Sequence, residues 1–309
     1  MNATVAAILE TILPVILALG FGMLCRSKKI LSREGIDNLK KVVVNLTLPF
    51  VLLSAFATAE YSAAALLLPS MTFVLCCVAL ALGFVIIRLS RMKSRLAPFL
   101  ASGFEAGMLG FSLFGLLFPD ESMSRFAMLV LGQEIFVFTL YKMLLTKKTD
   151  PKAILDDLLH SPTLIAVILG LIVGATGLYG KLQDWGVASI VESVTDFISA
   201  PTGTIILFTV GFDLVIREIP WKRTGGLLAM RLGLMALCFG LLVLLNRTVL
   251  NGMIFEGAAL LLVTLPAPYI IPIFTDEPSE RVQISSVLSA MTLLTMVLFA
   301  ILSVVYGLQ

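Results

Sequence analysis

An apolar segment over residues 97–118 is interrupted by Gly103-Phe104-Glu105-Ala106-Gly107-Met108-Leu109-Gly110, and a second over 255–275 by Leu265-Pro266-Ala267-Pro268-Tyr269-Ile270-Ile271-Pro272. Each segment is long enough to cross a bilayer, which takes about 20 apolar residues. Glycine tolerates unwound backbone and proline removes backbone donors, so we predict that both helices break midway. Inside lipid, unwound backbone survives only where protein or a water-filled cavity surrounds it. The two breaks therefore indicate an interior site.

The composition of the whole chain is that of a membrane protein. Of its 309 residues, 59% are hydrophobic and 14% are charged, against roughly 45–50% and about 25% in soluble domains. The net charge of +2 gives no reason to expect a nucleic-acid partner. The 4 Cys lack a metal-binding spacing, so we expect neither a metal nor a cofactor. No cluster of acids, bases or metal ligands indicates an enzyme.

Hydrophobic runs bounded by charged residues, Pro or Gly predict ten transmembrane helices. They cover residues 4–24, 39–59, 64–88, 97–118, 124–145, 162–179, 187–215, 225–246, 255–275 and 282–306. The first run lacks a basic n-region and a small-residue cleavage site, so we expect a retained helix.

The loops between these segments alternate sharply in charge. Eighteen of the 22 Lys and Arg residues fall on one side, chiefly in loops 26–41, 88–95, 142–152 and 217–223, and three fall on the other. By the positive-inside rule the basic side is cytoplasmic, which places both termini outside the cell or in the periplasm. We predict a multi-pass protein of the plasma membrane. The remaining cation, Arg231, starts the eighth segment near the cytoplasm, where we expect its side chain to snorkel to the interface.

Helix breakers recur at matching places in the two halves of the chain. Segments two and seven carry Asn45-Leu46-Thr47-Leu48-Pro49 and Pro201-Thr202-Gly203, while segments four and nine carry the two interruptions above. Because five is odd, consecutive five-helix units enter the membrane from opposite sides. We predict an all-α membrane protein with a five-plus-five inverted repeat, its units covering residues 1–160 and 161–309. Paired, interrupted segments of this kind are typical of a secondary transporter's substrate site.

Short motifs over the whole chain carry a family resemblance. They are Leu13-Pro14 through Gly22, Asn45 through Pro49, Ser161-Pro162, Ala200-Pro201 and Thr264-Leu265-Pro266-Ala267-Pro268. Together they resemble the auxin efflux carrier family, which includes bacterial organic-acid permeases. The resemblance implies a fold like that of the bile-acid symporters, with helices four and nine crossing at their breaks, and transport by alternating access. It leaves a homodimer open. The short loop 146–160 is similar to the compact prokaryotic form.

One position departs from the family's pattern. Members commonly have an Asn at the crossover of the fourth helix, where this chain has Glu105. A carboxyl group therefore stands at the expected crossover, and the substrates of members with the Asn do not carry over to this chain.

The crossover itself predicts an anion site. Half-helix N-termini carry roughly half a positive charge each, which favours an anionic group between them. We therefore expect a small organic anion, a carboxylate, as the substrate. The expected substrate-binding residues are Glu105, Gly107, Gly110, Asn45, Pro266, Pro268 and Tyr269.

Glu105 is also the main candidate for coupling. A charged carboxylate near the bilayer centre costs on the order of 3 kcal/mol, so such residues are usually functional. Our hypothesis is that Glu105 takes up a proton together with the anion; a structural carboxyl that stiffens the crossover is the alternative. Asp196 and Glu134 are further candidates for a coupling ion, and Gln133 for support of the crossover.

Several functions remain open on the sequence alone. A sodium site would use backbone carbonyls freed at the breaks, so sodium coupling is left open. A carboxylate that stays charged at residue 105 would favour a cationic or zwitterionic solute instead. A channel or a membrane sensor is less favoured.

Overall fold

The computed structural model describes residues 3–62, 67–92, 94–146, 160–214, 221–274 and 277–307. Every regular element within these ranges is a helix, which confirms the prediction of an all-α protein. Much of the basic loops, including residues 147–159 and 215–220, lies outside them.

The first half of the chain forms helices close to the predicted segments. The first span is α1 (Ala3–Ser27). The second is built from α2 (Arg33–Val42), the π-helical turn η1 (Val43–Thr47) and α3 (Leu48–Ala57). The third is α4 (Leu67–Leu89). The fifth comprises α6 (Met123–Phe136), the π-helical turn η4 (Val137–Tyr141) and α7 (Lys142–Thr146). Pro49 falls in the first turn of α3, so segment two is continuous and only locally widened by η1.

The second half contains one sharp bend. Helices α9 (Pro162–Ala175) and α10 (Leu178–Asp184) meet at 67°. Between them Gly177 has a φ of 68°, a left-handed conformation that glycine adopts without a Cβ clash. The later helices are α11 (Ala188–Ser199), α12 (Thr202–Asp213), α13 (Trp221–Thr248) and α15 (Pro278–Gly307).

Segments four and nine break where their glycines and prolines predict. Segment four starts as a 3-10 turn, η2 (Ala97–Ala101), and resumes after the break as the π-helical turn η3 (Ala106–Gly110) and α5 (Phe111–Leu117). Segment nine is α14 (Glu256–Thr264), followed by non-helical backbone and the 3-10 turn η5 (Ile271–Phe274). Segment seven also breaks, between α11 and α12 at Ala200-Pro201.

Nine of the ten predicted segments coincide with a candidate membrane span. Eight helices of the described residues are long and apolar enough, and the bent pair α9–α10 makes nine. The two ends of the chain meet, because a Cβ on Gly307 would lie 3.0 Å from Ile8. Termini on one side of a bilayer require an even number of crossings, so nine spans need a tenth, which the broken region 256–274 would supply. The ten-span inverted repeat stays a prediction.

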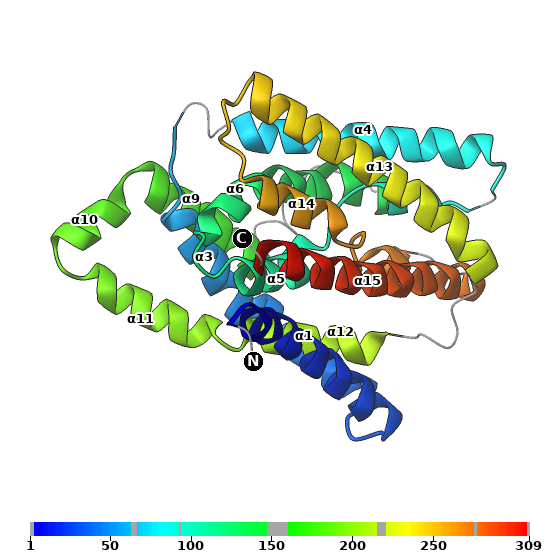
Figure 1. Cartoon of the computed structure of the whole chain (residues 1–309), viewed down its shortest axis with the longest axis horizontal. Coiled ribbons are helices and arrows are strands. Elements are labelled where there is room, and N and C mark those ends of the chain that lie inside the picture. The colour runs from blue at the N-terminus through cyan, green and yellow to red at the C-terminus, as the bar shows by residue number, and fades with distance from the viewer. Residues whose placement is uncertain are drawn as a thin grey trace.

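The helices pack into two groups (Figure 1). In the panel group, α1 packs along α12, and α3 packs against α9 and α11. In the crossover group, α4 packs against α6 and η2, and α13 packs against α14 and α15. Helix α5, the second half of segment four, belongs to the crossover group and packs against α6, and it also contacts α12 of the panel group. Each group draws helices from both sides of residue 160, so the two halves of the chain are interleaved in space.

Glycines bring helices of the same group into backbone contact. A Cβ on Gly22 of α1 would lie 2.6 Å from the backbone nitrogen of Phe212 in α12. In the crossover group, a Cβ on Gly132 of α6 would lie 2.8 Å from the backbone nitrogen of Phe73 in α4. Small residues allow this close approach, which is how helices gain packing energy within lipid.

The outward faces of the helices are apolar. Ile16 of α1 is 57% exposed, Val74 of α4 is 58% exposed and Phe197 of α11 is 83% exposed. Large apolar side chains exposed on several long helices are what a lipid-facing surface requires, so the protein is a multi-pass membrane protein.

Candidate functional site

The two broken segments are joined at Glu105. Its backbone N–H donates to the carbonyl oxygen of Pro266 at 2.9 Å, and its Oε2 accepts from the backbone N–H of Tyr269 at 2.7 Å. Glu105 also stands directly before η3, at the N-terminal end of the second half of segment four. Its partly buried carboxylate is thus held by a donor of one broken segment beside the helix start of the other.

Glycines on either side of Glu105 allow the segments to cross. Gly103 has a φ of 72°, and a Cβ there would lie 2.9 Å from Cγ of Pro268. A Cβ on Gly110 would lie 2.8 Å from Cδ1 of Leu265. Neither position has room for a side chain, so the crossing depends on both glycines.

Gln133 of α6 supports the unwound backbone next to Glu105. Its amide oxygen accepts from the N–H of Phe104 at 3.2 Å, and its amide nitrogen donates to the carbonyl of the same residue at 3.1 Å. Gln133 is 1% exposed, so no water replaces these bonds. The same amide nitrogen donates to Glu134 Oε1 at 3.0 Å. Gln133 thus links the unwound backbone at Phe104 to Glu134.

Arg231 of α13 lies within the crossover, and the expectation that it snorkels is wrong. The residue is 3% exposed, and its Nη2 donates to the carbonyls of Gly103 at 2.8 Å and Leu265 at 3.0 Å. Its Nη1 donates to the carbonyl of Leu100 at 3.4 Å, and its Cζ lies 5.0 Å from the centre of the Phe104 ring. The freed carbonyls of both breaks hold the guanidinium inside, which a single-helix argument could not foresee.

Helix α15 holds the other broken segment. The hydroxyl groups of Tyr269 and Thr292 form a hydrogen bond of 2.8 Å. Thr295, one turn further along α15, donates to the carbonyl of Thr264 at the end of α14 at 2.6 Å. The backbone of segment nine is therefore anchored on both sides of its break.

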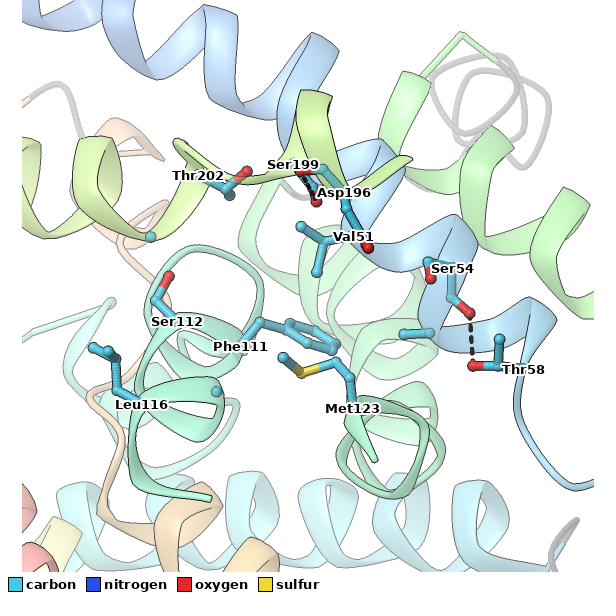
Figure 2. Close-up of a pocket in the computed structure, with 13 residues that line it drawn as sticks. Val51, Ser54, Thr58, Phe111, Ser112, Leu116, Met123, Asp196, Ser199 and Thr202 are labelled. Carbon is cyan, nitrogen blue, oxygen red and sulfur yellow. Dashed lines mark hydrogen bonds between the residues drawn. The ribbon is translucent and has the colours of Figure 1, made fainter. Parts of the chain in front are cut away.

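A cavity of about 310 Å³ lies between the panel group and the crossover group (Figure 2). The panel side supplies α3 and the broken helix pair α11–α12, and the crossover side supplies α5 and the start of α6. The cavity lies toward the end of the bundle opposite to the basic loop 26–41, since its α6 residue, Met123, begins that helix. Its lining residues are Val51, Ser54, Ala55, Thr58, Phe111, Ser112, Gly115, Leu116, Met123, Asp196, Ser199, Thr202 and Gly203.

The cavity lining contains hydroxyl groups and one charge. Asp196 is the one ionisable residue among the 13 that line it. Thr202 is 4% exposed, and its hydroxyl has no hydrogen-bond partner among the described residues. Figure 2 shows Asp196 and Thr202 on one wall and Ser112, Phe111 and Met123 on the other. The Thr202 hydroxyl oxygen is itself buried, so the accessible hydroxyl groups of the wall are those of residues such as Ser112 and Ser199.

The predicted site residues do not all meet in one place. Glu105, Pro266, Pro268, Tyr269 and Gly110 meet at the crossover, with Glu134 beside them, whereas Asp196 lines the cavity. Gly107 is partly buried on η3, where a Cβ would lie 3.9 Å from Leu48 of the panel group. Asn45 is exposed on η1 and does not line the cavity. Within the described residues, no three His, Cys, Asp or Glu side chains are placed to hold a metal.

The sequence did not predict two residues, Arg231 and Thr202, as parts of the site. Arg231 carried a signal, since it is the one cation that lies well inside a predicted apolar segment, away from its ends, and charges there are rarely left in lipid. Thr202 carried a weaker signal, because it directly follows the predicted break at Pro201. The carbonyl groups that Arg231 meets and the cavity that Thr202 lines are formed by helices distant in the sequence, so neither could be predicted.

Comparison with known families agrees with this architecture. A family described as membrane transport protein, which is the auxin efflux carrier family of the sequence resemblance, matches residues 7–306. No curated protein matches the chain. The match runs from the second turn of α1 to the last turn of α15 and so includes the helices of both groups and the crossover between them. The chain therefore belongs to the membrane transport protein family.

Proposed function

We propose that the protein is a secondary transporter of a small organic anion, a carboxylate, and that Glu105 couples its movement to a proton. The observation that carries the proposal is the 2.7 Å hydrogen bond from the Tyr269 N–H to the Glu105 carboxylate. A carboxylate of the protein already occupies the donor that the broken helices would offer to a substrate carboxylate.

Competition for this donor links the proton to the substrate. A charged Glu105 holds the Tyr269 N–H and repels an arriving anion. A protonated Glu105 loses most of its attraction for the N–H, so the substrate carboxylate can take its place. Binding of the anion and uptake of a proton then favour each other, which is the requirement for symport.

In this proposal the solute enters through the cavity between the two groups, whose lining residue Phe111 lies six residues after Glu105 in segment four. Its volume of about 310 Å³ is at the lower end of the range for small-molecule sites, about 300–1,000 Å³. The hydroxyl groups of Ser112 and Ser199 would bind the polar end of the solute, while Phe111 and Met123 contact its apolar part. Rocking of the crossover group against the panel group would expose the site to either side of the membrane in turn.

One observation favours a second candidate, the transport of a cationic or zwitterionic solute. Asp196 is the one charge of the cavity lining, and no Lys or Arg stands among those 13 residues to receive an anion. A cation would enter next to Asp196 and meet Glu105 in its charged form.

Transport measurements on proteoliposomes separate these candidates. Purified protein is reconstituted, and both uptake of labelled solute and solid-supported-membrane currents are measured for small mono- and dicarboxylates, amines and amino acids, with and without a pH step. Saturable carboxylate uptake that grows when the outside is acidified is expected; one proton with one monocarboxylate moves no net charge, so that case is read from uptake, whereas a dicarboxylate also gives a current. Currents with amines alone, reduced by Asp196→Asn, would replace the anion proposal with the second candidate.

A further inference from the structure

We propose that the guanidinium group of Arg231 is a built-in cation that occupies the place of a coupling metal ion at the crossover, so that transport needs no sodium. This inference deepens the proposed function, and its claim that transport needs no sodium rests on that function. Its claim that Arg231 takes the place of a cation at the crossover does not, and it is tested without a substrate.

The carbonyl groups that hold Arg231 come from both broken segments. Leu100 and Gly103 belong to segment four, and Leu265 is the C-cap residue that directly follows α14 in segment nine. Helix C-terminal ends carry a partial negative charge, and unwound backbone carbonyls at such ends are the groups with which transporters coordinate sodium. In this protein the same groups converge on a guanidinium.

The position of the charge argues against a surface role. Arg231 is the eleventh residue of α13, which places it about 15 Å along the helix at 1.5 Å per residue. None of the ion pairs among the described residues includes it, and its Nε has no hydrogen-bond partner. The Phe104 ring covers it at 5.0 Å. The positive charge is thus balanced by carbonyl dipoles and a ring face instead of a carboxylate, as a bound monovalent cation would be.

A purely structural brace makes a different prediction. If hydrogen bonds alone mattered, an uncharged amide donor would serve the carbonyls as well as a guanidinium. If the charge matters, its removal leaves carbonyls that attract a free cation, and only a charged side chain or an added cation restores the crossover.

The test compares three variants of Arg231 with a matched control. Arg231→Ala removes the group, Arg231→Gln keeps a donor without charge, and Arg231→Lys keeps a charge. The control is Arg26→Ala, because Arg26 also donates to two carbonyls, those of Phe212 and Leu214, but outside the crossover. The Tm of each purified full-length protein is measured in sodium chloride and in choline chloride at equal ionic strength, and again with added guanidinium at a low, non-denaturing concentration.

A built-in cation predicts a specific pattern of melting temperatures. For the wild type, Arg231→Lys and Arg26→Ala, the Tm of each protein should be the same in sodium chloride as in choline chloride. Arg231→Ala and Arg231→Gln should melt about 5 °C or more below the wild type in choline and recover part of that loss with sodium or guanidinium. Wild-type currents for the transported solute should be unchanged when choline replaces sodium.

Three results would overturn the inference. These are a saturable sodium requirement of the wild type, an Arg231→Gln protein as stable as the wild type, and an Arg231→Ala protein that responds equally to sodium and choline. Should Arg231→Ala fail to fold, the comparison of Gln with Lys still decides. An absence of carboxylate uptake would instead count against the proposed function and leave the melting result intact.

Discussion

At the scale of single residues, the crossover contains two opposite charges that do not pair with each other. Glu105 accepts from the backbone N–H of Tyr269, whereas Arg231 donates to the carbonyls of Gly103 and Leu265. Each charge therefore meets the end of a broken helix whose partial charge is opposite to its own. The protein neutralises both kinds of helix end with its own side chains; in the proposed mechanism the substrate carboxylate displaces Glu105, whereas Arg231 stays in place.

Glu105→Gln should separate binding from proton coupling. Glutamine keeps an oxygen acceptor for the Tyr269 N–H but cannot take up a proton, so the variant should bind and exchange the solute while losing accumulation driven by a pH gradient. Counterflow and gradient-driven uptake in proteoliposomes measure the two properties. The pH dependence of the wild type should have the sign of a protonation: uptake rises as the outer pH falls. Equal gradient-driven uptake by wild type and variant would contradict the role given to Glu105.

Gln133→Leu should lower stability through the unwound backbone. Leucine leaves the N–H and the carbonyl of Phe104 buried without partners, at a cost on the order of 2–4 kcal/mol. Thermal unfolding in detergent measures the loss. Gln183→Leu, a change at an exposed position on α10, is the control and should stay near the wild type. Equal melting of the two variants would show that Gln133 does not support the break.

At the scale of elements, glycines bring the backbones of neighbouring helices within each group into close contact. In the panel group, α1 and α12 meet at Gly22 and Gly211, and α9 meets α3 at Gly170, where a Cβ would lie 2.8 Å from Cβ of Phe56. Backbone-to-backbone contacts cannot adjust by a change of rotamer, so we expect the helices of one group to move together.

Gly211→Ala should destabilise the panel group, because its Cβ would lie 2.6 Å from Cα of Leu19 on α1. Overpacking of this kind costs about 1–3 kcal/mol. Gly20→Ala is a matched control on the same pair of helices, since no atom lies within 4 Å of its Cβ and alanine favours the helix. The expected result is a lower Tm for Gly211→Ala alone, read from thermal unfolding of the purified proteins. Comparable losses in both would refute close contact at Gly211.

At the scale of the whole molecule, the interface between the groups is where motion is expected. The cavity lies between them, with Ser112 of α5 facing Gly203 of α12. Alternating access requires that this interface opens and closes while each group stays intact.

A disulfide across the interface should therefore stop transport. A Cβ on Gly203 would lie 3.6 Å from Cβ of Ser112, within the disulfide range of about 3.5–4.5 Å. The pair Ser112→Cys with Gly203→Cys, in a background where the four native cysteines are replaced by alanine, should lose solute currents on oxidation and regain them with a thiol reductant. The two single variants are the controls and should ignore both treatments. Unchanged currents in fully cross-linked protein would exclude relative motion at this contact.

Hydropathy and helix breakers predicted ten spans, and nine of them agree with the structure. They also predicted the breaks in segments four and nine and the place of Glu105 at the first of these. These are local properties: a run of apolar residues must be helical in lipid, and a Gly- or Pro-rich stretch within it must unwind whatever its neighbours are. The same reasoning could not assign the face of a helix, so it grouped the exposed Asn45 with the crossover residues.

Contacts between distant parts of the chain were decided by the tertiary structure alone. Glu105 meets a residue 164 positions away, and Arg231 meets carbonyls 131, 128 and 34 positions away. Considered on a single helix, an arginine side chain is expected to extend to the nearest membrane interface. It cannot include the carbonyl groups that two other segments release beside it, because those groups come together only when the helices cross.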